Sequence, residues 1–153
     1  MLPLRFLIMH YLTFSGYNYS KKRCERIVNW FVDKHLPNHK VIINVDHLGL
    51  LHEGVFGWMW AADCYYRPRD FEIELHNRMN PENYTKTLLH ELWHLYQHVT
   101  GQLRDKYNKR LWKGVDHSET DYEDQPWEVE AHRMEEVLYK EYTTYLSTSN
   151  LKL

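Results

Sequence analysis

The stretch from Asn80 to Gly101 constrains the fold of this chain most, because it has the pattern of one long helix with two different faces. Asn80 as N-cap and Pro81 at the first helical position form a start signal, and Gly101 forms a stop signal. An apolar stripe at helical spacing lies between them: Thr85, Leu88, Leu92, Leu95, Tyr96 and Val99. We therefore expect this helix to be sandwiched, with its stripe packed on one layer and its other face turned toward another element or a cleft.

The other face carries an H-E-x-x-H motif, formed by His90, Glu91 and His94. Two histidines four residues apart lie one turn apart on nearly the same face, so each imidazole can give one nitrogen to a single metal ion. Glu91 lies about 100° round the helix from His90, from where its carboxylate can reach a metal-bound water without being a ligand. The motif indicates a zinc hydrolase, with Glu91 as general base. The alternative is a chance occurrence on a solvated face, since the chain has 11 histidines.

A catalytic zinc site needs a third protein ligand in addition to water. His98 follows His94 by one turn, but it lies eight residues, roughly 12 Å along the axis, from His90. The two cannot both bind one ion, so we interpret His98 as a rim or helix-end residue. A second helix that crosses the first is the better source. The run of residues 128–132, Glu-Val-Glu-Ala-His, opens the last predicted helix.

The two motifs together resemble the gluzincin metallopeptidases, in which H-E-x-x-H is followed by a helix that reads E-x-x-x-D/N, often E-x-E-A-D or E-x-E-A-N. Thermolysin, the CAAX prenyl endopeptidases and the small ImmA-like and SprT-like zincins show related patterns. The resemblance covers about residues 20 to 145. It implies a zinc ion bound by His90, His94 and Glu128, with Glu91 as general base and a protein or peptide as substrate.

The second motif leaves several roles open. Round the axis of the last helix, Glu130 and Glu128 lie at about the same angular distance from the middle of the apolar stripe. Periodicity therefore does not decide which of the two is the ligand. The residue four positions after the ligand is usually Asp or Asn in the family and hydrogen-bonds a ligand histidine, whereas here it is His132. Tyr122 and His117, in the loop between the ligand helices, are candidate donors to an oxyanion, although their position in a polar loop favours reading each as a plain surface residue.

The remaining patterns predict an α+β fold. Ser20 starts a helix from about 20 to 36, residues 41–45, 55–62 and 71–76 are typical of strands, and residues 47–53 of a turn. Residues 102–125 suggest a long polar surface connection, and Pro126 starts the last helix. We expect a minimal zincin-like fold with roughly three or four mostly antiparallel strands, flanked by the N-terminal helix, the H-E-x-x-H helix and the C-terminal ligand helix.

The strand at 71–76 alternates cleanly between apolar and polar residues. Phe71, Ile73 and Leu75 are expected to face the core, and Glu72, Glu74 and His76 to face outward. We expect this strand to form the sheet edge above the cleft, where an extended peptide substrate pairs with its main chain. The alternative is an edge strand that binds no substrate and whose charged side chains only discourage self-association.

Length and composition narrow the class of protein. The 153 residues suit one domain, residues 1–153, and the net charge of −2 gives no basic footprint for nucleic acid. No segment has the roughly 20 apolar residues of a membrane span, and the apolar residues 1–14 fit a strand or an added core segment. Cys24 and Cys64 make no disulfide framework, which favours reduced thiols in the cytoplasm.

We therefore expect a cytoplasmic, monomeric zinc peptidase. The alternative function is that of a zinc-binding zincin-fold protein that binds a partner without cutting it. Glu91 favours the enzyme, because a purely structural zinc site has no need of a base and is usually closed by a fourth protein ligand.

Overall fold

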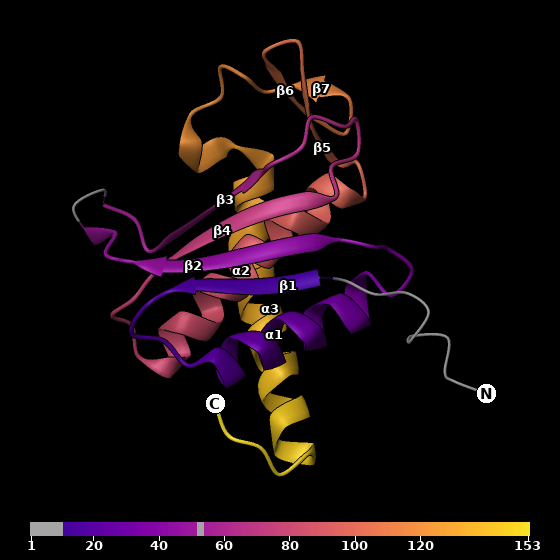
Figure 1. The fold of residues 1–153 in the computed structure, drawn as a ribbon. Coiled ribbons are helices and arrows are strands. Elements are labelled where there is room, and N and C mark those ends of the chain that lie inside the picture. The colour runs from indigo at the N-terminus through magenta and orange to yellow at the C-terminus, as the bar shows by residue number, and fades with distance from the viewer. Residues whose placement is uncertain (1–10, 52–53) are drawn as a thin grey trace.

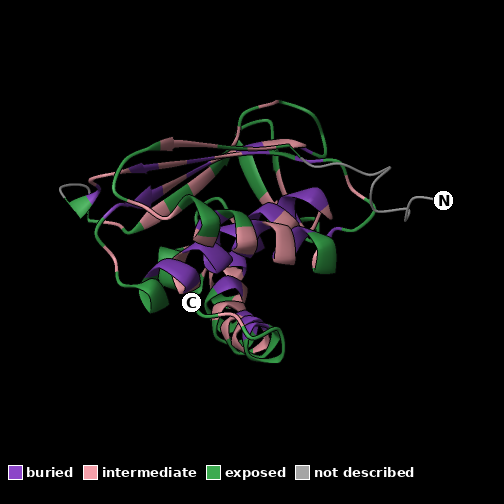
Figure 2. Cartoon of the chain, turned by 60° about the horizontal axis from the view of Figure 1, so that its bottom comes forward, coloured by how far each residue is buried: buried purple, intermediate pink, exposed green. Residues whose placement is uncertain are grey.

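The computed structural model describes residues 11–51 and 54–153, which form an α+β fold. Its elements are β1 (Tyr11–Gly16), α1 (Lys21–His35), β2 (Ile42–Leu48), β3 (Gly57–Ala61), β4 (Asp70–His76), α2 (Pro81–Val99), β5 (Leu103–Lys106), β6 (Lys109–Trp112), β7 (Val115–Asp116), the 3-10 helix η3 (Tyr122–Asp124) and α3 (Pro126–Thr148). The three α-helices lie on one side of the main sheet (Figures 1 and 2). All three predicted helices are thus confirmed.

The main sheet has the strand order β1-β2-β4-β3. The pairs β1–β2 and β2–β4 are parallel, and only β3–β4 is antiparallel. The expectation of a mostly antiparallel sheet is therefore wrong for this sheet. Between β1 and β2 the physical reason is the crossover through α1, which returns the chain to the sheet in the same direction. Between β2 and β4 the chain forms β3, which is antiparallel to β4, so it reverses direction twice and β4 runs parallel to β2.

The expectation that residues 71–76 form the edge is also wrong, because β4 pairs with β2 on one side and with β3 on the other. The edge strand beside α2 is β3. Phe71, Ile73 and Leu75 are buried as expected. His76 was expected to face outward but is buried, and its Nδ1 accepts a hydrogen bond from the Leu50 N–H at 3.1 Å. The chain after β2 thus folds over the end of β4.

Helix α2 forms as its sequence signals predict. The Asn80 side chain accepts a hydrogen bond from the Asn83 N–H at 2.8 Å, and Gly101 ends the helix with a φ of +81°. The stripe is buried except at Tyr96, which is half-buried. It joins a core with contributions from the other helices and the main sheet, including Ile27, Phe31, Ile43, Val45, Ile73, Leu138 and Tyr142.

The segment expected to be a polar surface connection, residues 102–125, is instead a small antiparallel sheet, β5-β6-β7, followed by η3. Two tight turns join its strands. Tyr107 and Asn108 both have positive φ, and so do Lys113 and Gly114, which is the backbone of the two-residue turns that favour hairpins. This second sheet lies beyond the β3 edge of the main sheet (Figure 1).

Three smaller expectations have clear outcomes. Strand β2 runs on to Leu48, so the turn expected from His47 starts later. The strand expected in the N-terminal segment appears as β1, while residues 1–10 of that segment lie outside the described part. Within the described residues, no helix is long and apolar enough to cross a membrane.

Candidate metal centre

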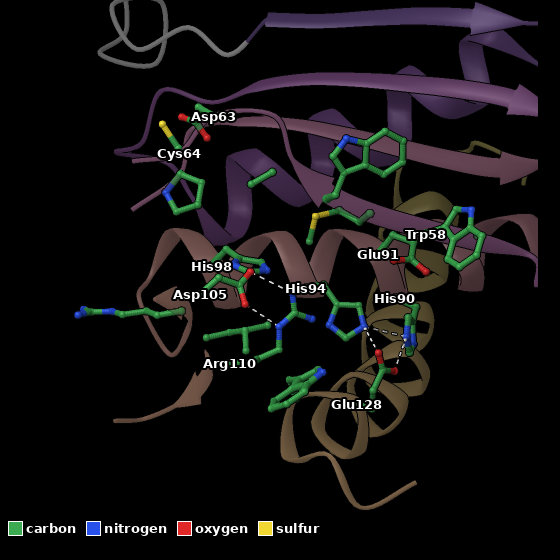
Figure 3. A pocket seen from close by; sticks show the side chains of 18 of the residues that line it. Trp58, Asp63, Cys64, His90, Glu91, His94, His98, Asp105, Arg110 and Glu128 are labelled. Atoms are coloured by element: carbon green, nitrogen blue, oxygen red, sulfur yellow. Dashed lines mark hydrogen bonds and ion pairs between the residues drawn. The ribbon is translucent and has the colours of Figure 1, made fainter. Parts of the chain in front are cut away.

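Helices α2 and α3 bring the three predicted ligands together. The Nε2 atoms of His90 and His94 are 3.1 Å apart, and the Glu128 carboxylate lies 3.3 Å from the first and 3.0 Å from the second (Figure 3). Ligand atoms at about 2.1 Å from a tetrahedral zinc ion are about 3.4 Å from each other. The three side chains therefore fit one zinc ion with little movement. The expected zinc at this position remains a prediction.

Both histidines are oriented through their outer ring nitrogen. The Nδ1 of His90 lies 2.8 Å from the Glu135 carboxylate, and the Nδ1 of His94 lies 2.9 Å from the side-chain oxygen of Gln97. A carboxylate and an amide oxygen only accept hydrogen bonds, so each Nδ1 carries the proton and each Nε2 can turn a lone pair toward the centre. Metal-binding histidines are commonly held in this way.

Glu130, the competing third ligand, has a different task. Its carboxylate accepts hydrogen bonds from Trp93 Nε1 at 2.8 Å and from Gln97 Nε2 at 3.2 Å. Gln97 also donates to the Trp127 carbonyl at 3.1 Å. Glu130 thus holds in place the side-chain amide of Gln97, which orients His94, while Glu128 is the acid that faces both histidines.

Sequence reasoning missed Glu135 and Gln97 as partners of the histidines. The signal was present but weak: Gln97 follows His94 by three residues on α2, and Glu135 follows Glu128 by seven, two turns along α3. Spacing of this kind is shared by many surface residues, and only the crossing of the helices shows which of them meet the histidines.

The electrostatics of the group favour a cation. Burial alone would lower the pKa of His90, but the carboxylates of Glu128 and Glu135 outweigh it and raise this pKa to about 10. Burial would raise the pKa of Glu128, but its hydrogen bonds to His90 and His94 prevail and hold that pKa well below its usual range. A proton on His90 thus occupies the place that a metal ion would take, so metal binding would release it.

Glu91 lies buried beside the ligands and lines the same cleft. Burial raises its pKa, although the two histidines oppose the shift. A carboxyl group with a raised pKa can hold a proton for part of a reaction cycle, which is what a general base at neutral pH requires.

The centre forms part of the wall of a cleft of about 720 Å³. Strand β3 contributes one wall and α2 another, and the chain after β3, the β5–β6 hairpin, η3 and the start of α3 line the rest. Several of the lining side chains are aromatic: Trp58, Trp60, Tyr65, Tyr66, Tyr122 and Trp127. His98, expected at the rim or the helix end, lies in the last turn of α2 and lines the cleft, but it is buried.

Of the two candidate oxyanion donors, only one borders the cleft. The Tyr122 hydroxyl donates to the Glu128 carboxylate at 3.0 Å, and burial, followed by the charge of Glu128, raises its pKa to about 12. His117 instead lies 3.1 Å from the Thr120 hydroxyl and lines a separate depression beside the β5–β6 hairpin. Tyr122 therefore remains a candidate oxyanion donor, whereas His117 lies outside the cleft.

His132 stands on the outer side of Glu128. Its Nε2 is 3.9 Å from the Glu128 carboxylate, and its ring centre is 4.7 Å from that of His90. His90, Glu128 and His132 thus also form a compact group of potential ligands. His94 is the better ligand beside His90 and Glu128, because it is buried and its Nε2 lies 3.0 Å from the Glu128 carboxylate, against 3.9 Å for the Nε2 of His132.

Likeness to known proteins gives no independent guide to the site. Comparisons of the chain with protein-family models, with curated proteins and with solved structures find no match. The resemblance to gluzincins therefore rests on the two sequence motifs alone.

Proposed function

We propose that this protein is a zinc-dependent peptidase. The observation that carries the proposal is the convergence of His90, His94 and Glu128 within 3.0 to 3.3 Å of one another in the wall of an open cleft, with Glu91 buried beside them. Zinc held by these three side chains would supply Lewis acidity, which makes water a nucleophile at neutral pH and polarises a carbonyl group. A structural zinc site would have no need of Glu91 or of the cleft.

The protein's own groups would handle the protons. Glu91 takes a proton from the attacking water and passes it to the leaving amine, a role that suits a buried carboxylate with a raised pKa. Tyr122 keeps its proton at neutral pH, because its pKa is raised to about 12, and its hydroxyl can donate to the developing oxyanion. Its contact with Glu128 places that hydroxyl at the centre.

The cleft suggests how a substrate binds. Among the described residues β3 is an edge strand of the main sheet and borders the cleft, so an extended peptide can pair with its main-chain N–H and C=O groups. The role first expected of residues 71–76 thus passes to β3. Trp58 and Trp60 of this strand, together with Trp127 opposite, favour substrates with bulky apolar side chains.

The state of the two cysteines supports a proposal for the cellular compartment. Cys24 and Cys64 are both unpaired, and Cys24 is buried in the core. Reduced thiols of this kind suit the cytoplasm, where we propose that the protein acts as a monomer.

A rival function is binding of a protein partner without hydrolysis, and Glu91→Gln separates the two. The change keeps the size and burial of the side chain but removes the base, so we expect a full metal content and a fall in peptide hydrolysis of about 10²- to 10⁴-fold. Metal analysis and cleavage of a mixed peptide library by wild type and variant provide the measurements. Undiminished hydrolysis in the variant would refute the mechanism, whereas a fully metal-loaded wild type without hydrolysis would favour the rival.

A further inference from the structure

We propose that a basic depression on the second sheet, lined by Arg104, Lys106 and Lys113, binds an acidic segment of the substrate. The inference rests on the proposed peptidase and names the class of peptide that it selects. The depression has a volume of about 290 Å³, and among the described residues its lining contains these three cations and no acid. The chain as a whole has a net charge of −2, so this concentration of positive charge is local.

The alternation of the strands separates these cations from the nearest acids. Arg104 and Lys106 lie on one face of β5 and Asp105 on the other, because successive side chains of a strand point to opposite faces. Asp105 accepts two hydrogen bonds, at 2.7 and 2.9 Å, from Arg110, which is opposite it on β6. Asp116 shares the face of Arg104 by register but lies two strands away. The cations of the depression are therefore left for an anion from outside.

Arg104 is held in place before any ligand binds. Its Nε donates to the Gly101 carbonyl at 2.9 Å, and its guanidinium lies 4.1 Å from the centre of the Tyr66 ring. Only glycine permits this approach, because a Cβ at position 101 would lie 2.6 Å from a terminal nitrogen of Arg104. Among the described residues Arg104 has no carboxylate partner. A guanidinium that is already ordered loses little freedom when it binds a carboxylate.

The depression adjoins the candidate substrate cleft. Tyr66 and Arg104 line both hollows, so their stacked pair is the border that the two share. A peptide that lies along β3 and leaves the cleft across this border enters the depression. Its Asp or Glu side chains then meet the three cations in charge-assisted hydrogen bonds. A nucleic acid would not depend on this border and would favour a longer basic track.

Matched peptides test the proposal. Each labelled peptide has the same bulky apolar segment joined to a run of either Glu or Gln, and each pair is made with the run at either end. Fluorescence anisotropy gives the Kd on the Glu91→Gln protein with zinc added, so that the peptide stays intact. In one of the two orientations we expect the Glu peptide to bind at least about tenfold more tightly than the Gln peptide, and the advantage to shrink as salt is added.

Variants locate the source of this advantage. In the Glu91→Gln background, Lys106→Gln/Lys113→Gln and Arg104→Gln should each reduce the ratio of the two Kd values to about threefold or less. The ratio compares two peptides on one protein, so a general loss of binding does not imitate the effect. Lys140→Gln is the matched control, because it removes an exposed cation from α3, and it should keep the full ratio.

Four results would overturn the acidic-segment site. They are equal Kd values for the Glu and Gln peptides in both orientations, a ratio that neither depression variant changes, an equal loss with Lys140→Gln, and an oligonucleotide that displaces the peptide better than added Glu peptide does. The second would assign the preference to the metal centre. The readout is binding, so failure of this site is distinct from failure of the proposed peptidase, which would appear as absent hydrolysis of every peptide by wild type.

Discussion

Glu135 provides the sharpest test of how the candidate metal centre is built, because it is not one of the three proposed ligands and the sequence motifs do not include it. Its carboxylate accepts the Nδ1–H of His90 at 2.8 Å from a side chain that is 24% exposed. Removal of such an orienting partner lowers metal affinity by about 10- to 100-fold, which is about 1.4 to 2.7 kcal/mol. Gln keeps an acceptor oxygen but loses the charge, whereas Ala loses both.

We therefore expect Glu135→Gln to raise the Kd for zinc about tenfold and Glu135→Ala to raise it nearer a hundredfold. Competition with a chromophoric chelator at fixed pH measures both values. Glu136→Gln is the matched control, because the neighbouring carboxylate is 63% exposed and pairs with Lys86 at 3.2 Å instead of His90. Kd values within about twofold of wild type for both Glu135 variants would refute the view that this contact prepares His90 for the metal.

The remaining predictions concern the ligand choice, the oxyanion and pH. Glu128→Ala should strip zinc, whereas Glu130→Ala, which only loosens the support of an orienting amide, should weaken binding less; metal analysis that finds the reverse would make Glu130 the ligand. Tyr122→Phe should lower kcat about 10²-fold at unchanged metal content, and an unaltered kcat would remove it from the reaction. Burial lowers the pKa of His98 to about 4, below its unfolded value of about 6.5. Between these two pKa values His98 is protonated in the unfolded chain but neutral in the folded protein. The free energy of unfolding of the metal-free protein is therefore unaffected at pH 7 and falls between about pH 6.5 and 4, by up to about 3 kcal/mol. Urea unfolding at a series of pH values should show a smaller fall for His98→Leu, and an equal fall would contradict this assignment.

The sequence by itself determined what depends on neighbours along the chain. The caps and stripe of α2 predicted that helix, and the spacing of His90 and His94 placed two imidazoles on one face before any tertiary contact was known. The alternation at 71–76 identified Phe71, Ile73 and Leu75 as core residues. These features follow from the 3.6-residue and two-residue periods of the elements, which every local segment carries in its own residues.

Only the tertiary structure decided which elements are neighbours. The alternation of β4 is the same at an edge as between two strands, so neither its central place nor its parallel pairing with β2 could be derived from it. The second sheet was hidden because its strands are only two to four residues long. In the candidate metal centre, the different contacts of Glu128, Glu130 and Glu135 arise from the angle at which α3 crosses α2. Side chains one or two turns apart on a helix have almost identical sequence signals, and the partner helix alone distinguishes the acid that meets two histidines from those that orient or brace them.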